Sequence, residues 1–268
     1  MDDINYKSYW KVITELTGYD FSGYTSDSLS NRLDSFISYE SIASADELRE
    51  KLFYDKHAQE AILGKLLSNY TEMFRDPLFF HSLRTKVLPF LSMYPKISIW
   101  HAGCSTGEEV YSLAILLDEL DLLGRCQIYA TDVNELNLKK ATSGIYTLDM
   151  VQKSSARYFR SGGKKNLSKY YTAYYDHIIF HKKLRASIKF INHDLIKDKS
   201  FSRFHLILCR NVFIYFSLAL QDKALHSMIN STYNYGYFGI GSQESIINLE
   251  NFRLTPIDNE NRIYRKIM

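Results

Sequence analysis

The 268-residue chain has the composition of a globular protein, with 46% hydrophobic and 24% charged residues, which excludes an intrinsically disordered chain. Its length favours one large domain, or a large domain with a small one. No apolar stretch approaches the roughly 18 residues that cross a bilayer, and the first residues lack the pattern of a signal peptide. The three cysteines have no metal-ligand spacing, so we expect no disulfide, no metal site and a cytoplasmic protein.

The formal net charge of +3 is unevenly distributed along the chain. Residues 1–68 contain seven Lys or Arg and twelve Asp or Glu, whereas residues 152–190 contain ten basic residues and one acid. The basic segment is able to attract an acidic partner or a nucleic acid, but a solvated surface explains the charges equally well.

The first quarter of the chain predicts a small helical domain over residues 1–68. Apolar residues recur there at helical spacing, first at Tyr9, Val12 and Leu16. Ser44 followed by Glu47 is typical of a capping box at the start of a helix. A further helix is expected over residues 58–67.

From residue 97 onward, short β-rich runs alternate with amphipathic segments. This alternation predicts an α/β fold, a parallel sheet with helices on both faces. The expected strands are 96–100, 127–131, 188–192, 204–209 and 237–240, and the expected helices are 108–120, 134–142 and 220–229. Residues 150–187 depart from this alternation of strands and helices and predict a small antiparallel insertion.

The segment from His101 to Glu109 joins the first predicted strand to the first predicted helix. Gly103 and Gly107 permit a tight turn and close approach by a ligand. Glu108 and Glu109 place negative charge where a dinucleotide would put its pyrophosphate, so the turn favours an amine-bearing ligand that Glu109 could hold. The other interpretation is a glycine turn with acids that stabilise a helix start.

Asp132 ends the second predicted strand, 25 residues after Gly107. An acid at this position is suited to accept hydrogen bonds from two ribose hydroxyls, although it could instead cap the helix that follows. The glycine turn and the acid together favour a ligand that contains a nucleoside.

Six segments of the chain occur in an order that resembles the chemotaxis receptor glutamate methyltransferase (CheR) family. They are Ser68–Pro77, Ala102–Glu109, Ala130–Asp132, Ser143–Tyr146, Cys209–Phe216 and Gly236–Glu244. The resemblance implies an S-adenosylmethionine (SAM)-dependent methyltransferase that esterifies glutamate side chains of chemotaxis receptors. It also implies a small N-terminal helical domain and a Rossmann-like SAM-binding domain over residues 69–268 with an inserted β-subdomain.

The resemblance also implies which residues contact SAM. Glu109 would contact the methionine amino group, Asp132 the ribose, and Asp194 with Leu195 the adenine. The remaining expected contacts are Asn69, Thr71, Arg75, Arg210 and Asn211. No metal is expected.

A glutamate side chain is already ionised at neutral pH, so methyl transfer to it requires no general base. The site has only to hold the reacting atoms in line and exclude water. The expected catalytic residues are Arg75 or Arg210, which would orient the substrate carboxylate, and Tyr215, which would donate a hydrogen bond to it. Tyr215 could instead be a packed aromatic residue.

The expected partners are the cytoplasmic domains of chemotaxis receptors, bound through the basic segment 152–190 or by strand addition at the insertion. Neither nucleic acid nor direct membrane insertion is expected. Two alternatives compete with this hypothesis: a SAM-binding regulatory module with little catalysis, and a nucleic-acid methyltransferase. The nucleic-acid enzyme is disfavoured because no Asp/Asn-Pro-Pro-Tyr/Phe motif follows the fourth predicted strand.

Overall fold

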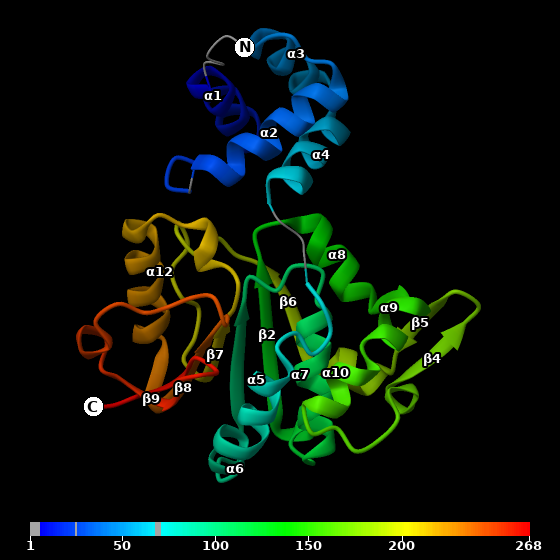
Figure 1. Ribbon diagram of the computed structural model, residues 1–268, viewed down its shortest axis with the longest axis vertical. Coiled ribbons are helices and arrows are strands. Elements are labelled where there is room, and N and C mark those ends of the chain that lie inside the picture. The colour runs from blue at the N-terminus through cyan, green and yellow to red at the C-terminus, as the bar shows by residue number, and fades with distance from the viewer. Residues whose placement is uncertain (1–5, 25, 68–70) are drawn as a thin grey trace. The chain divides into compact units, whose positions relative to one another are not determined.

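The computed structural model describes residues 6–24, 26–67 and 71–268, which form two compact units (Figure 1). One unit consists of the N-terminal helices together with Ile214–Asp222, and the other contains the rest of the described chain. Each unit has its own hydrophobic core. The expected domain boundary at residue 68 lies outside the described residues, and the sequence did not indicate that Ile214–Asp222 groups with the helices.

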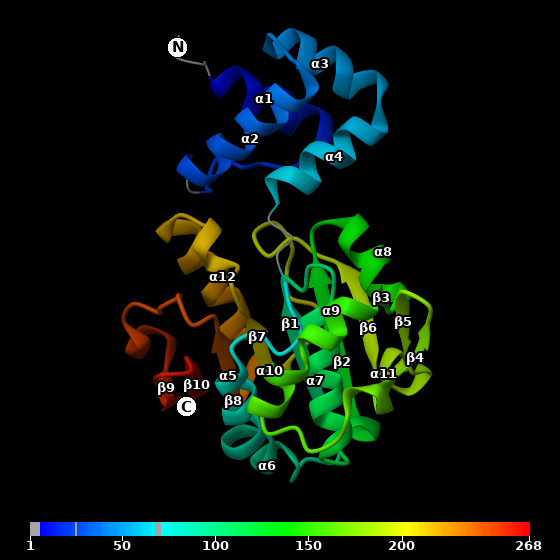
Figure 2. The ribbon, with the colours of Figure 1, turned by 45° about the vertical axis from the view of Figure 1, so that its right-hand side comes forward.

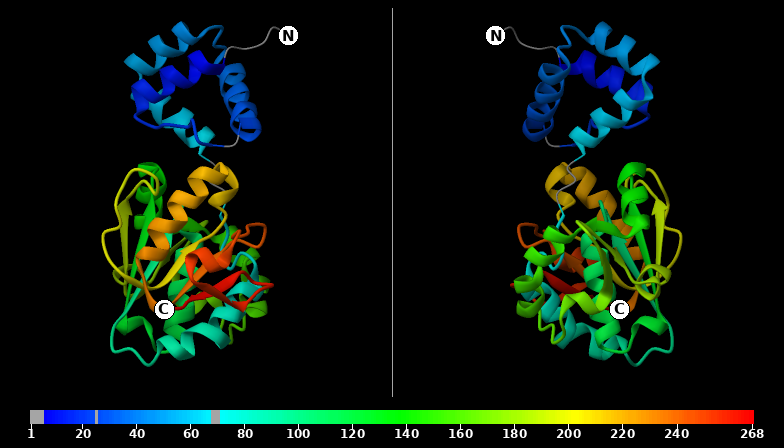
Figure 3. Two further views of the ribbon diagram at one scale, coloured as in Figure 1. Left: turned by 90° about the vertical axis from the view of Figure 1, so that its left-hand side faces the viewer. Right: turned by 90° about the vertical axis from the view of Figure 1, so that its right-hand side faces the viewer.

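The N-terminal helices pack around one apolar cluster of side chains, and Figure 3 shows the ribbon of these helices from two opposite sides. Their bounds are α1 Tyr6–Thr17, α2 Ser26–Glu40, α3 Ala45–Tyr54 and α4 Lys56–Leu66. At the start of α3, Ser44 Oγ accepts a hydrogen bond from the Glu47 amide at 3.2 Å. The Glu47 side chain in turn accepts one from the Ala43 amide at 2.7 Å. The expected capping box is confirmed, except that the Glu47 side chain accepts from the amide of Ala43 rather than from that of the N-cap residue Ser44.

The segment Ile214–Asp222 is held by the loop between α1 and α2. The Ser217 amide donates to the Gly23 carbonyl at 2.8 Å, and the Tyr24 and Phe216 rings meet edge to face at 5.1 Å. A Cβ atom at Gly23 would lie 2.3 Å from the Leu220 side chain, so only glycine fits without displacing it. This segment contains the first residues of helix α12, Leu218–Asn230.

The second unit is built on a seven-stranded sheet with the order β6-β2-β1-β7-β8-β10-β9. The first five strands of this order are parallel, and β10 is antiparallel to both of its neighbours. Figure 2 shows β6 at one end of the sheet and β9 with β10 at the other. The bounds are β1 Ile97–Ala102, β2 Cys126–Asp132, β6 Ile188–Asn192, β7 Phe204–Cys209, β8 Thr232–Ile240, β9 Leu254–Asp258 and β10 Ile263–Lys266. The expected α/β fold is confirmed.

The central strands are apolar on both faces because helices cover both sides of a parallel sheet. Five of the six residues of β1 are buried, as are five of the six of β7. Among the described helices, none is long and apolar enough to cross a membrane. The flanking helices, besides α12, are α5 Pro77–Ser82, the π-helical turn Leu83–Val87, α6 Leu88–Leu91, α7 Glu108–Glu119 and α8 Glu135–Ser143.

A three-stranded antiparallel sheet with the order β3-β5-β4 interrupts the larger fold, as the sequence predicts. It lies beyond α8, toward the β6 end of the large sheet (Figures 1 and 2). Its first strand, β3, precedes the expected start of the insertion at residue 150. The bounds are β3 Ile145–Thr147, α9 Leu148–Lys153, α10 Ser155–Arg160, β4 Tyr171–Tyr174, β5 His177–Phe180 and α11 Lys182–Ala186.

A buried carboxylate at the end of α7 ties the insertion to the larger sheet. Glu119 accepts hydrogen bonds from the hydroxyls of Tyr158 and Tyr170, the latter at 3.1 Å, and forms an ion pair with Arg84. Hydrogen bonds to a charged group are stronger than those between neutral groups. The two tyrosine contacts therefore fix the insertion against α7, the helix that follows β1, while Arg84 reaches the same carboxylate from the π-helical turn Leu83–Val87.

Tyr170→Phe removes one hydrogen bond to a buried charge, so we expect it to lower the free energy of unfolding by about 1–2 kcal/mol. Urea unfolding measures this loss. Tyr174→Phe, at an exposed position of the following strand β4, is the matched control and should change stability little. Equal effects of the two substitutions would contradict a role for the Glu119 contact.

Candidate functional site

The candidate site lies at the carboxyl ends of four adjacent strands, β6, β2, β1 and β7. The chain runs from β1 through β2 to β6 in one direction and from β7 to β8 in the other. Ligands of open α/β sheets bind where the strand order reverses in this way. The acid Asp132 ends β2, and Glu109, Asp194 and Arg210 follow β1, β6 and β7.

The turn between β1 and α7 is tight and left-handed at three residues. Gly103, Ser105 and Gly107 have φ values of 73°, 49° and 90°. A Cβ atom at Gly103 would lie 2.4 Å from Val212, and one at Gly107 would lie 2.8 Å from Ala141. Both glycines are therefore required by close packing as well as by backbone conformation.

Glu109 lies in the first turn of α7, is only 4% exposed, and has both oxygens occupied. Its Oε1 lies 3.0 Å from His101 Nε2, and its Oε2 accepts from Arg210 Nη1 at 2.5 Å. Burial alone would raise the pKa of Glu109, but the charge of Arg210 and the contact with His101 lower it to about 2. The carboxylate is therefore ionised at every physiological pH.

Arg210 joins three segments of the second unit. Besides Glu109, its guanidinium donates from Nη2 to Asp76 Oδ2 at 2.6 Å, and it stacks 4.0 Å from the centre of the Phe79 ring. Asp76 precedes α5 in a left-handed conformation, with φ of 53°, and its carboxylate makes no capping bond to that helix. The side chain of Arg210 is 1% exposed, so these partners compensate a buried charge.

Asp132 bridges the turn after β1 and the start of α8. Its two oxygens accept from the amides of Ser105 at 2.7 Å and Asn134 at 2.9 Å. Burial raises the pKa of Asp132 despite these bonds. The helix-cap interpretation of Asp132 is wrong, because Asn134 is the N-cap and accepts from Leu136 N at 2.9 Å.

Glu244 is a site residue whose role the sequence did not indicate. It is 4% exposed, and its Oε2 accepts from the amides of Gly241 at 2.6 Å and Asn211 at 2.8 Å. It therefore joins the segments that follow β7 and β8. Asn211 adopts a left-handed conformation with φ of 58°, and its buried Oδ1 has no hydrogen-bond partner among the described residues.

The other expected site residues are less closely connected. Asp194 is half-buried and accepts from the Ile196 amide at 2.8 Å, and Leu195 beside it is half-buried too. Thr71 and Arg75 are half-buried in the segment before α5. Tyr215 belongs to the N-terminal unit, and Asn69 lies outside the described residues.

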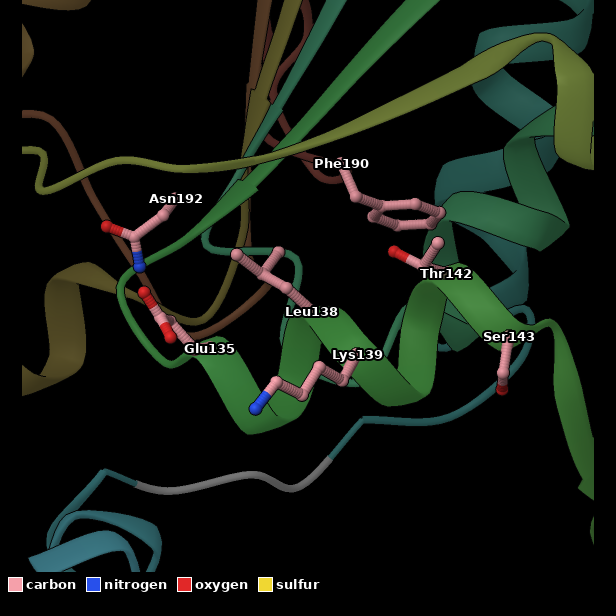
Figure 4. A pocket seen from close by; sticks show the side chains of 7 residues that line it. All are labelled: Glu135, Leu138, Lys139, Thr142, Ser143, Phe190 and Asn192. Atoms are coloured by element: carbon pink, nitrogen blue, oxygen red, sulfur yellow. The ribbon is translucent and has the colours of Figure 1, made fainter.

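An open groove of about 580 Å³ runs along α8 and the edge strand β6 (Figure 4). Leu138 and Phe190 give it an apolar surface, and Glu135, Lys139 and Asn192 give it polar groups. None of the residues expected to bind a cofactor lines this groove.

Glu109→Gln leaves Arg210 with one ionic partner fewer, so we expect a loss of about 3 kcal/mol in unfolding free energy at pH 7. The folded-state pKa of about 2 lies below the ordinary 4.5. The ionised group therefore contributes its full stabilisation above about pH 4.5 and loses it as the pH falls toward 2.

Urea unfolding of the native protein and Glu109→Gln at pH 7, 4 and 3 measures this dependence. The difference between the two should narrow as the pH falls. Glu50→Gln, at an exposed position of α3, is the control for loss of one carboxylate. A difference that stays constant down to pH 3 would contradict the ion pair.

Comparison with known proteins identifies the family of the chain. The family model "CheR methyltransferase, SAM binding domain" matches residues 69–260. The protein Cher3 of Pseudomonas putida is 38% identical, over 98% of this chain and 97% of its own length. A chemotaxis protein methyltransferase of Listeria monocytogenes is 28% identical, over 95% of both chains. An uncharacterized 104.1 kDa protein of Rhodobacter capsulatus is 27% identical over 86% of this chain but only 24% of its own length. The chain therefore belongs to the CheR family of SAM-dependent methyltransferases.

Proposed function

We propose that this protein transfers a methyl group from SAM to glutamate side-chain carboxylates of chemotaxis receptors in the cytoplasm. The products are glutamate methyl esters. The observation that carries the proposal is the buried, ionised Glu109 at the start of α7, at the same carboxyl edge of the sheet as Asp132, in a chain of the CheR family.

The hydrogen-bonding groups of the candidate site fit SAM. An ammonium group and two ribose hydroxyls are donors, so they need acceptors on the protein. Glu109 would accept from the ammonium group and Asp132 from the ribose, because each carboxylate oxygen keeps a lone pair beyond the bond it already makes. Asn211 Oδ1 offers another buried acceptor. The proposed contacts are completed by Asn69, Thr71, Asp194 and Leu195.

When bound, SAM supplies an electrophilic methyl group on a positively charged sulfur. The substrate glutamate has an ordinary pKa near 4.3 and is already a carboxylate at neutral pH. The proposed reaction therefore uses neither a metal nor a base. The protein has to orient the carboxylate toward the methyl group and exclude water, and its contribution is mainly one of placement.

Of the two arginines proposed to orient the substrate, Arg210 already makes ion pairs within the protein. Both terminal nitrogens of Arg210 are already bonded, to Glu109 and Asp76. Arg210→Ala would also leave two carboxylates without their partner, so loss of activity in that variant would not identify a substrate contact. Arg75 is half-buried and follows Thr71 in the segment before α5.

Tyr215 is proposed to donate a hydrogen bond to the substrate carboxylate. The Arg32 guanidinium lies 5.2 Å from the centre of its ring, and Arg32 also donates to the Leu66 carbonyl at 2.7 Å. These contacts limit the positions that the ring can adopt. They equally suit a packed aromatic residue, so Tyr215→Phe, which keeps the ring, separates the two roles.

Two other functions use parts of the same site. A regulatory module that binds SAM without transferring its methyl group would need Glu109 and Asp132 but neither Arg75 nor Tyr215. A nucleic-acid methyltransferase would use the basic segment 152–190. Neither explains the order of motifs as well as a receptor methyltransferase does.

The proposed receptor surface is the insertion. Lys164, Lys165 and Lys182 are exposed there, whereas Lys183 is paired with Asp118 at 2.7 Å. Receptor segments that carry several glutamates are acidic and would be attracted to these lysines. The edge strand β4 is also suited to pair with an added strand.

Incubation with methyl-labelled SAM and receptor cytoplasmic fragments tests the function. We expect label on glutamate that is released by mild base, because a carboxyl methyl ester hydrolyses where an N-methyl group does not. Binding of SAM without any transfer would instead support the regulatory module. Label that withstands base would contradict esterification.

Charge reversal tests the docking surface. Lys164→Glu with Lys165→Glu should raise KM for the receptor fragment about tenfold at low salt, with less effect at high salt. The double variant Lys56→Glu with Lys65→Glu makes the same charge change on the exposed face of α4 and is the matched control. Equal effects of the two variants would contradict docking at the insertion.

A further inference from the structure

A buried histidine lies in the middle of the large sheet, and the proposed chemistry does not use it. His101 is the fifth of the six residues of β1, and its neighbours in the adjacent strands are Ala130 and Leu208. It is 2% exposed. Burial of an imidazole among apolar strands costs free energy unless its nitrogens have partners, so this position calls for an explanation.

The partner of His101 is Glu109. The distance from Nε2 to Oε1 is 3.0 Å. An ionised carboxylate can only accept, so His101 must carry a proton on Nε2 and donate it. The other nitrogen, Nδ1, is buried and has no hydrogen-bond partner among the described residues. The imidazole is therefore held at this position by a single polar contact.

The two donors on Glu109 reach different oxygens from different strands. His101 lies in β1 and binds Oε1, while Arg210 follows β7 and binds Oε2. Arginine can also bind both oxygens of one carboxylate with its two parallel N–H groups. The contact with His101 opposes this arrangement, because it holds Oε1 away from the guanidinium.

We propose that His101 is a positioning residue that holds the Glu109 carboxylate in the orientation that recognises the amino group of SAM. This inference rests on the proposed function, in which Glu109 binds that amino group. Without His101, the Glu109 carboxylate turns toward Arg210, and one of its lone pairs is no longer available to accept from the amino group of the ligand. The nucleoside part of the ligand is bound elsewhere, so its recognition stays intact.

Two ligands separate this role from general support of the fold. S-adenosylhomocysteine carries the amino acid part, whereas 5′-methylthioadenosine keeps the nucleoside and the thioether but lacks the amino group. His101→Leu should raise the dissociation constant of S-adenosylhomocysteine about tenfold, which is the effect of losing one charge-assisted contact. The dissociation constant of 5′-methylthioadenosine should change less than twofold. His101→Gln restores a donor at the end of the side chain and should recover most of the loss.

Isothermal titration calorimetry of the full chain gives both affinities. In methyl transfer, His101→Leu should raise KM for SAM by the same factor while kcat stays within twofold. His205→Leu removes an imidazole from β7 that contacts Ser98 rather than Glu109, and it should leave both affinities unchanged. If His101→Leu does not fold, His101→Ala carries the same expectation without adding bulk.

If His101→Leu weakened the binding of both ligands equally, or of neither, the proposed role of His101 would be wrong. A failure of the proposed function looks different. In that case the unsubstituted protein itself would not bind S-adenosylhomocysteine or would not methylate the receptor fragment. Selective loss in His101→Leu that His101→Gln does not rescue would also overturn the inference, because the donor would then be irrelevant.

Discussion

The site depends on one buried cation. Arg210 has no access to water and so requires negative charge nearby, and the chain supplies it from two distant segments, Glu109 in α7 and Asp76 before α5. This requirement joins the end of β7 to the turn after β1 and to the segment that carries Arg75. It also keeps Glu109 ionised in a place where burial alone would favour the neutral acid.

Two acids of the candidate site, Glu109 and Asp132, have pKa values shifted in opposite directions because their partners differ. Glu109 is paired with a full positive charge and has a lowered pKa, whereas Asp132 is held by backbone amides and has a raised one. A cationic amino group is best met by a carboxylate that stays charged. Ribose hydroxyls, which Asp132 is proposed to bind, need only an acceptor, and a carboxylate bonded to amides still offers one.

Local patterns in the sequence were enough to predict the sheet, its insertion and the family. Strands 188–192 and 204–209 match the structure residue for residue. The second of them is a buried parallel strand, which appears in the sequence as a short apolar run. The strands β9 and β10 were missed. These strands contain charged and polar residues, as in Tyr264–Lys266, and therefore lack the clear alternation of apolar and polar residues that predicts a strand.

Neither the partners of Arg210 nor the contact between His101 and Glu109 could be predicted from local sequence patterns. Ion pairs between residues more than 100 positions apart depend on the register of strands, which local patterns do not contain. In the sequence, His101 only begins the segment between the first strand and the first helix, and its burial and its contact with Glu109 follow from the structure. Likewise, Glu244 ends a sequence motif, but its bond to the Asn211 amide follows only from the structure.

The grouping of Ile214–Asp222 with the N-terminal helices has a practical consequence for truncating the protein. A fragment that starts after the fourth helix would contain the whole SAM-binding sheet, yet it would carry this stretch without Gly23 and Tyr24. Phe216 and Leu220 would then lose apolar neighbours and face water. A single cut after α4 therefore does not separate the two units cleanly, because Ile214–Asp222, which includes the first residues of α12, contacts residues that the cut removes.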